Sequence, residues 1–443
     1  MNLISKNNFI ERQHGIRRQE ASPEALVKTA IVFICFCYMG FPGKYADIIS
    51  GGLNTFCEYG VFTLEILLML SCGSSKVYDF QVINLKRKYI PVYFMLLVYF
   101  VDSMLVSKYP KLQIITCLRF SVMVLFALWL SDQYSVEQLL EVVQLAQCIF
   151  VIVQYGFLIL FPGMAFGHES GGNDFIGLFE TKNNCAQELA LGIIVQVLLY
   201  LIKRKHGRRV SQGFIFLLVA QLILMILCNA RGAILSMSIP IVYILFLEPR
   251  NRIFKSLPIG IVYIIGSAGF IIFSMTLLPL AKPILDLLGK DITLTGRTLL
   301  WKRILSVITQ SHTFTGYGFG MFWRNASAVA KIHTGFQRNT FFGTMMTGSH
   351  NEILELWLNV GLIGLAAYFI AVLGSTVKVH LMPRDQYIFV STYLIWYMMI
   401  TWTERSSIFT LSAVLFYVTL GVAASKSVAR KKSRQEWKYQ SDL

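Results

Sequence analysis

Apolar runs of about 20 residues recur along the whole 443-residue chain, and they limit its fold more than any other feature. A run of that length crosses a bilayer as an α-helix, because a helix satisfies its backbone polar groups internally. Only 14% of the residues are charged, against about 25% in soluble globular proteins. The first run is followed by many others, so we interpret it as a membrane span and not merely as a cleaved signal peptide. The sequence therefore predicts an all-α polytopic membrane protein.

The apolar runs predict about twelve transmembrane helices. They lie near residues 26–41, 53–71, 89–106, 112–130, 139–162, 184–202, 212–229, 232–248, 257–278, 351–372, 387–402 and 407–424. With the N-terminus inside, the cytoplasmic segments collect the basic clusters, which are Arg12/Arg17/Arg18, Lys86/Arg87/Lys88 and residues 203–209, 250–255 and 429–438. The positive-inside rule therefore predicts that both termini are cytoplasmic. The same rule accounts for the net charge of +16 without a nucleic-acid partner.

Two external segments, 163–183 and about 279–349, are longer than the other external loops. In the second, "TGRTLLWKRILSVITQ" (295–310) predicts an amphipathic helix that is capped by Thr295 and lies along the membrane surface. This loop holds eight Lys or Arg and two acids, so we expect an anionic partner outside the membrane. We divide the chain into residues 1–278 with nine spans, a periplasmic loop at 279–350, and residues 351–443 with three spans and a basic tail.

The motifs of metal-dependent catalysis are missing from the sequence. DxD, HExxH and GxxxxGK[ST] do not occur, and the external segments hold few carboxylates that could bind a divalent cation. His312, His333 and His350 share the long loop, but their spacing matches no zinc pattern. We therefore expect no metal and no other cofactor.

Two arginines and one histidine fall at the external ends of predicted helices. Arg231 lies between the seventh and eighth spans, Arg297 opens the loop helix, and His350 with Asn351 precedes the tenth span. Each has an ordinary explanation, as an interfacial arginine, a solvated residue or a helix cap. Together they bring guanidiniums, which bind phosphate bidentately, to the same membrane face as an imidazole suited to general-base work. The combination fits a lipid diphosphate substrate handled without a metal.

Three motifs resemble the O-antigen ligase and polymerase family in order and spacing. They are "TGRTLLW" at 295–301, "GYGFGMFW" at 316–323 and "HNEILELWLNVGLIGL" at 350–365, and the second is most similar to the exopolysaccharide-polymerase branch. Shorter stretches at 177–192, 229–233 and 401–409 are similar to further family segments. The chain departs from the family at Thr181, Ala230 and Asn359, where His, Ser and an acidic residue are usual.

The resemblance implies a metal-independent glycosyltransferase of the GT-C type in the bacterial inner membrane. Its donor is a glycan on undecaprenyl diphosphate, held at the periplasmic face by Arg231 and Arg297, while His350 activates or orients the acceptor hydroxyl. Chain-length regulators and export proteins are further expected partners. The resemblance also implies supporting substrate contacts from Lys182, Asn183, Asn351 and Glu404, and it leaves open whether Tyr317, Phe319 and Trp323 stack on sugar rings or pack within the loop.

We favour a polysaccharide polymerase that transfers the lipid-linked glycan onto a lipid-linked repeat unit. Ligation to lipid A–core and protein O-glycosylation are the alternatives within the family, because loop surfaces decide the acceptor. A flippase for the same lipid is the alternative from another class. Transporters often carry internal repeats and charged residues at the membrane midplane, whereas this chain shows no repeat, and we expect its intramembrane Asp102 and Arg119 to pair structurally.

Overall fold

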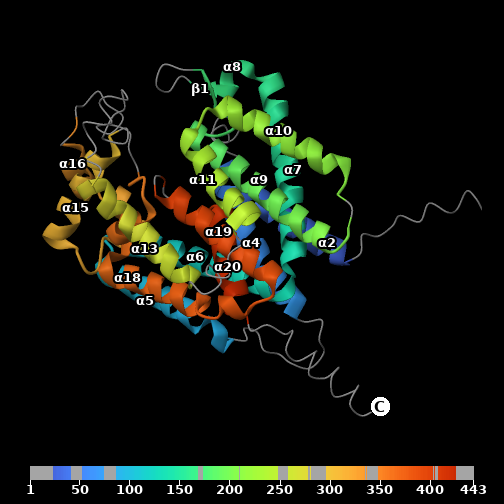
Figure 1. The fold of residues 1–443 in the computed structure, drawn as a ribbon. Helices are drawn as coiled ribbons and strands as arrows, with labels where there is room; N and C mark the ends of the chain where they lie inside the picture. Colours follow the sequence, from blue (N-terminus) through green and yellow to red (C-terminus); the bar gives the residue numbers. More distant parts are fainter. Residues whose placement is uncertain are drawn as a thin grey trace, which may run out of the picture.

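The computed structural model describes residues 23–40, 52–73, 86–167, 173–208, 210–247, 258–277, 280, 296–334, 336, 348–402, 404 and 408–425. This part of the chain is a bundle of helices with one two-stranded hairpin (Figure 1). All twelve predicted runs are helical, as α2 (Pro23–Tyr38), α4 (Leu53–Gly73), α5 (Ile90–Val106), α6 (Pro110–Gln133), α7 (Val136–Leu160), α9 (Lys182–Lys205), α10 (Gln212–Cys228), α11 (Arg231–Val242), α13 (Ile259–Ile272), α18 (Glu352–Thr376), α19 (Arg384–Thr401) and α20 (Leu411–Ala424).

Length and composition mark the chain as a multi-pass membrane protein. Six helical segments of the described residues can cross a bilayer, namely Arg87–Val106, Pro110–Gln133, Val136–Leu160, Lys182–Lys205, Ile259–Leu277 and Glu352–Leu381. Three further apolar helices are shorter, namely Gln212–Cys228, Arg231–Phe246 and Leu411–Ala424. Twelve spans and the orientation of the chain remain predictions.

Local sequence signals fix several helix ends. Ser135 and Gln138 form a reciprocal capping box at the start of α7, which satisfies backbone N–H groups that have no partner inside the helix. α6 begins at Pro110, whose missing N–H costs nothing at the first helical position. At the start of α9 the hydroxyl of Thr181 accepts from the backbone N–H of Asn184 at 3.3 Å. Thr181, where the family usually has His, is therefore a helix cap.

Within the predicted external loop, the described residues form α15 (Arg297–Ser311), the short helix η6 (Phe322–Arg324) and α16 (Ala326–His333), which lie beside α18 at one end of the bundle (Figure 1). The apolar face of α15 is buried in a small core shared with α16 and the start of α18. That core comprises Leu300, Trp301, Ile304, Val307, Ile308, Tyr317, Phe322, Ala328, Ile332, Leu354 and Leu358. The prediction that this face lies on the membrane is therefore wrong, since protein covers it. The N-cap position is Gly296, and Thr295 lies outside the described residues.

A glycine turn fastens the loop to α18. Gly316 has a φ of +64°, and a Cβ built there would lie 2.6 Å from the backbone N of Gly361. Gly361 itself has φ 63° and ψ −170° and kinks α18. At the kink the backbone N–H of Tyr317 donates to the carbonyl of Leu358 at 2.9 Å. The "GYGFG" motif is thus a docking turn, because glycine tolerates positive φ and close backbone approach.

The intramembrane charges do not pair as expected. Arg119 of α6 forms an ion pair with Glu58 of α4 at 2.9 Å, and its guanidinium lies over the ring of Phe409 at 4.6 Å. Asp102 is buried in α5. The expected Asp102–Arg119 pair is therefore wrong, because the arginine turns toward the neighbouring helix that carries a carboxylate.

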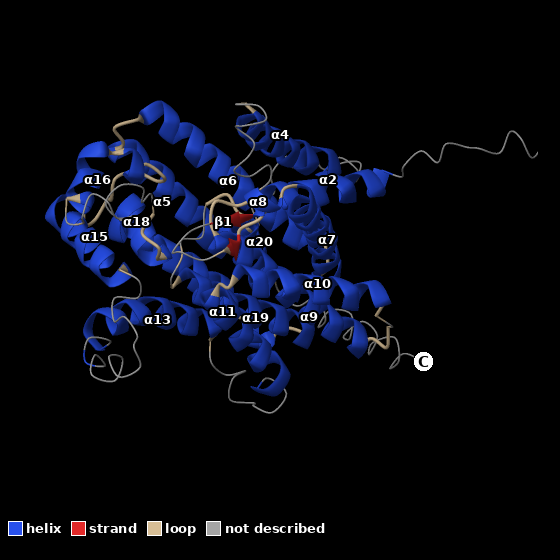
Figure 2. Cartoon of the chain, turned by 90° about the horizontal axis from the view of Figure 1, so that it is seen from above, coloured by secondary structure: helices blue, strands red, loops and turns tan. Residues whose placement is uncertain are grey.

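Within the segment 163–183, β1 (Phe166–Gly167) and β2 (Asp174–Phe175) pair as two antiparallel strands, preceded by α8 (Pro162–Ala165) (Figure 2). After β2 the backbone N–H of Ile176 donates to the carbonyl of Ala165 at 2.9 Å, and that of Leu178 donates to the Gln154 side chain at 3.2 Å. These bonds fix the hairpin against α7 and place Asp174 beside the end of α10.

Candidate active site

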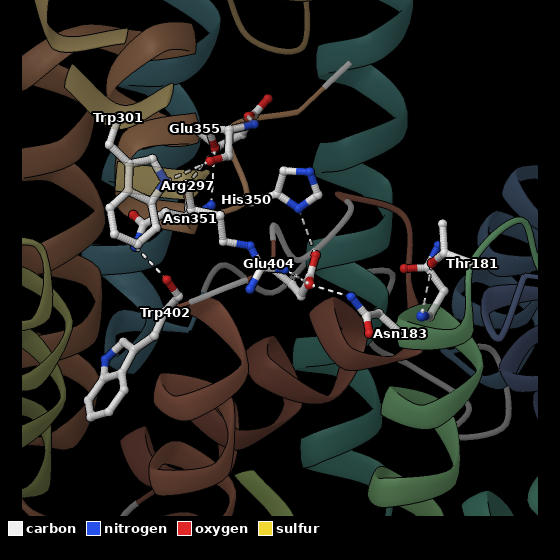
Figure 3. A network of polar contacts seen from close by, with 11 residues as sticks. Thr181, Asn183, Arg297, Trp301, His350, Asn351, Glu355, Trp402 and Glu404 are labelled. Atoms are coloured by element: carbon white, nitrogen blue, oxygen red, sulfur yellow. Dashed lines mark hydrogen bonds and ion pairs between the residues drawn. The ribbon is translucent and has the colours of Figure 1, made fainter. Parts of the chain in front are cut away.

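The carboxylate of Glu404 joins three side chains from distant parts of the sequence (Figure 3). Its Oε1 accepts from Nη2 of Arg297 and, at 2.9 Å, from Nδ2 of Asn183. Its Oε2 accepts from Nδ1 of His350 at 2.9 Å. The side chains of Arg297, Glu404 and His350 are 20%, 14% and 25% exposed, so the cluster is mostly buried but keeps an exposed part that a ligand can reach.

Electrostatics keep Glu404 ionised and set the tautomer of His350. Burial alone would raise the pKa of the Glu404 carboxyl, but the hydrogen bond from His350 and the charge of Arg297 hold it below its ordinary value. An ionised carboxylate only accepts hydrogen bonds, so the proton of a neutral His350 must sit on Nδ1. Nε2 is then the basic nitrogen of the ring.

One indole and one side-chain amide hold the polar cluster in place (Figure 3). Trp301, one turn after Arg297 on α15, donates its Nε1–H to the carbonyl of Ser349 at 2.9 Å. Asn351 donates its amide to the carbonyl of Trp402 at 3.1 Å, and thereby ties the start of α18 to the turn that carries Glu404. Both residues flanking His350 are therefore anchored.

His350 does not cap α18. Asn351 is the N-cap, with its side chain accepting from the backbone N–H of Leu354 at 3.1 Å, and the helix begins at Glu352. His350 has a φ of +51°, and Asn229 is the other non-glycine residue of the described chain with positive φ. Such strain persists where the surrounding structure imposes it, commonly at functional sites. The ordinary explanation of His350 as a helix cap is therefore wrong.

A small cleft that is open to solvent lies beside the cluster. The residues that line it come from four helices and the turn after α19: Asn183, Gln187, Gly232, Ala233, Ser236, Arg297, Ile400 and Glu404. Three of those helices begin with a cation, namely α9 with Lys182, α11 with Arg231 and α15 with Arg297, and of these Arg297 lines the cleft.

Arg231 and Lys182 lie apart from the Glu404 cluster. Arg231 is exposed at the rim, directly before the cleft-lining Gly232. Lys182 donates from Nζ to Oδ2 of Asp174 at 2.6 Å, and this bond lowers the pKa of the Asp174 carboxyl. Of the three predicted cations, Arg297 alone lines the cleft and contacts Glu404 among the described residues.

The predicted aromatic contacts are mostly internal. The Tyr317 ring is buried and packs against His312, with centroids 4.0 Å apart, and Phe319 is buried against Phe120 at 4.6 Å. Their rings are covered by protein, so sugar stacking on them is wrong for this structure. Trp323 is half-buried and donates to Oε1 of Glu355 at 2.8 Å.

Sequence reasoning missed two carboxylates that organise the site. Glu355 accepts from Trp323, and its Oε2 accepts from the backbone N–H of Ser349 at 3.0 Å. Asp174 holds Lys182. Both stand out in the sequence, Glu355 as an acid in an apolar helix and Asp174 as one of few external acids, but nothing in the sequence names their partners. Asn359, which departs from the family pattern, donates to the backbone carbonyl of Glu355 at 2.8 Å.

Across the described ranges, no three His, Cys, Asp or Glu side chains come close enough to hold a metal ion. Metal independence itself stays a prediction that biochemical measurement must test.

Comparison with known proteins agrees with the motifs. Residues 214–369 match the family model described as O-antigen ligase. This region runs from α10 to α18 and includes Arg231, Arg297 and His350. No curated protein matches the chain. The resemblance expected from the motifs is confirmed over residues 214–369, which match the O-antigen ligase family.

Proposed function

We propose that the protein is a metal-independent glycosyltransferase that polymerises a polysaccharide from lipid-linked repeat units. The donor is a glycan on undecaprenyl diphosphate, and the acceptor is the sugar of a second lipid-linked unit. The observation that carries this proposal is the cluster of Arg297, Glu404 and His350, in which Arg297 and Glu404 line a cleft that the first turns of α9 and α11 also line.

The helix N-termini favour an anionic ligand in the cleft. A helix N-terminus carries partial positive charge, so a cation at its first position is unfavourable unless an anion lies nearby. Lys182 and Arg297 are compensated by Asp174 and Glu404. Arg231 forms no ion pair with any described residue, and its N-cap Ala230 offers no side-chain hydrogen bond. A diphosphate at this position would satisfy both the arginine and the helix terminus.

The His350–Glu404 pair supplies a base beside the cleft, since Glu404 lines it and contacts His350. In the proposed reaction an acceptor hydroxyl oxygen attacks the anomeric carbon of the donor, and the bond from that carbon to the diphosphate oxygen breaks. Nε2 of His350 takes the hydroxyl proton, and Glu404 stabilises the resulting imidazolium. Arg231 and Arg297 stabilise the negative charge on the departing lipid diphosphate.

A polymerisation assay with purified protein and lipid-linked repeat units tests the proposal. Arg231→Lys and Arg297→Lys keep the charge and lose the planar fork, so each should remove most of the long product. Arg384→Lys is the matched control, because Arg384 also opens a helix but lies at the far end of α19 from Ile400 and the cleft. Wild-type product from both site variants, or activity lost in EDTA and restored by magnesium, would contradict the proposal.

Ligation to a separate acceptor is the second candidate, because the matching family model is described as O-antigen ligase. The same diphosphate-binding arginines and the same base serve both reactions, and only the acceptor differs. Deletion of the gene separates them. Loss of long chains with single repeat units still transferred indicates a polymerase, whereas full-length chains that accumulate on the lipid carrier indicate a ligase.

A further inference from the structure

A second polar network runs from the N-terminus of α9 to the turn that precedes Arg231. Asp174 of β2 accepts from Nζ of Lys182 at 2.6 Å and from Nδ2 of Asn229 at 3.1 Å. Asp174 is 9% exposed, so these bonds lie at the edge of the protein interior. The carboxylate therefore joins the start of α9 to the end of α10.

Asn229 occupies a demanding backbone position. It is the residue that ends α10, with a left-handed φ of 49° and ψ of 36°. The chain then reverses, and α11 begins two residues later at Arg231. Asparagine is one of the few residues that adopt this conformation readily. The hydrogen bond from its side-chain amide to Asp174 fixes the orientation of the turn. It therefore also fixes the direction in which α11 presents its first residue.

The position of Arg231 depends on this turn. Its side chain is exposed, and no described residue forms an ion pair with it. The following residues Gly232 and Ala233 line the cleft, so a shift of the turn moves the arginine relative to the cleft. By contrast, Arg297 is fixed directly by Glu404.

We propose that Asp174 is a positioning residue that sets Arg231 for binding the lipid diphosphate. It acts through two contacts, the ion pair with Lys182 and the hydrogen bond to Asn229. Lys182 then serves to hold Asp174 and does not contact the diphosphate. This role replaces the substrate contact that the resemblance implied for Lys182. The inference rests on the proposed function, because it assigns Asp174 to the same diphosphate site.

A double-mutant cycle tests this coupling with full-length protein in nanodiscs and undecaprenyl diphosphate as the binding probe. We expect Asp174→Asn and Arg231→Lys each to weaken binding about tenfold or more. The double variant should bind no more weakly than the more severe single variant, because both changes disable the same contact. Asp174→Asn combined with Arg297→Lys should show the two losses multiplied. If Asp174 acts on stability alone, the binding loss of Asp174→Asn should multiply with the loss of either arginine variant.

A second variant avoids any loss of folding in Asp174→Asn. Asn229→Gly keeps the left-handed turn and removes the amide that binds Asp174, so it should reproduce the binding loss. Glu141→Gln is the control. It breaks the ion pair with Lys203, which lies at the end of α9 opposite Lys182, and it should leave binding unchanged. Normal binding by Asn229→Gly, or multiplied losses with Arg231→Lys, would overturn the inference. Normal binding by Arg231→Lys itself would instead remove the arginine from the proposed function.

Discussion

Replacing Glu404 by Gln keeps the size of the side chain and removes the charge that joins Arg297 to His350. Glu404 accepts hydrogen bonds from Arg297, Asn183 and His350 through its two oxygens. Glutamine has one acceptor oxygen, and its other terminal atom is an NH₂ donor. If the oxygen keeps Arg297, the NH₂ group faces Nδ1 of His350, which must then give up its proton to accept. The imidazole proton moves to Nε2, and the base is lost.

The size of the effect follows from that change of tautomer. General-base catalysis contributes about 10²–10⁴-fold to a rate, which corresponds to roughly 3–5 kcal/mol of activation free energy. We therefore expect Glu404→Gln to lower the rate of polymerisation by at least about a hundredfold. Binding of undecaprenyl diphosphate should fall much less, because Arg297 keeps one partner and Arg231 is untouched.

The assay measures initial rates of chain growth by purified protein with lipid-linked repeat units. Glu141→Gln serves as the control, because its ion pair with Lys203 at 2.9 Å lies at the other end of α9. Such a partly exposed pair contributes only about 0–1 kcal/mol to stability. A rate for Glu404→Gln within a fewfold of wild type would refute the reasoning that Glu404 orients the base.

Three further outcomes are expected. Gly316→Ala should lower the free energy of unfolding by roughly 2–5 kcal/mol, because overpacking and left-handed strain add. The new Cβ would lie 2.6 Å from the backbone of Gly361. Gly156→Ala, whose Cβ would meet nothing within 4 Å, should be harmless in the same thermal unfolding measurement. Because the folded-state pKa of Glu404 is lowered, its contribution to stability should be complete above the unfolded value of about 4.3 and lost as pH falls through the folded value. Thermal unfolding across pH should therefore show a shallower acid-side loss for Glu404→Gln, and an unchanged slope would contradict this. A reporter active only outside the cytoplasm should work when fused after residue 335 and stay silent after residue 206, and the reverse pattern would invert the predicted topology.

The sequence was sufficient for the helices and for part of the site. Apolar length and charge placed all twelve helical runs, because these depend on local composition. The order of motifs brought Arg297 and His350 to one site, where the structure joins them through Glu404. Their separation of more than fifty residues is bridged by α15, whose Trp301 binds Ser349.

Long-range contacts limited what the sequence could predict. An amphipathic pattern shows that one face of α15 is buried, but not whether lipid or protein covers it. The burial of Tyr317 depends on the kink of α18 at Gly361, which is more than forty residues away. Lys182 appeared available for a phosphate until its contact with Asp174 was known.

His350→Asn separates a role of His350 on the acceptor from a purely structural role. Asparagine adopts the left-handed φ of +51° that His350 has, and the cap of α18 is supplied by Asn351, so the variant should fold. We expect it to bind undecaprenyl diphosphate normally and to polymerise at least about a hundredfold more slowly. Asn351→Ser, which keeps a good capping residue, should cost less. Near-normal chain lengths from His350→Asn on a gel would contradict the assignment of the base.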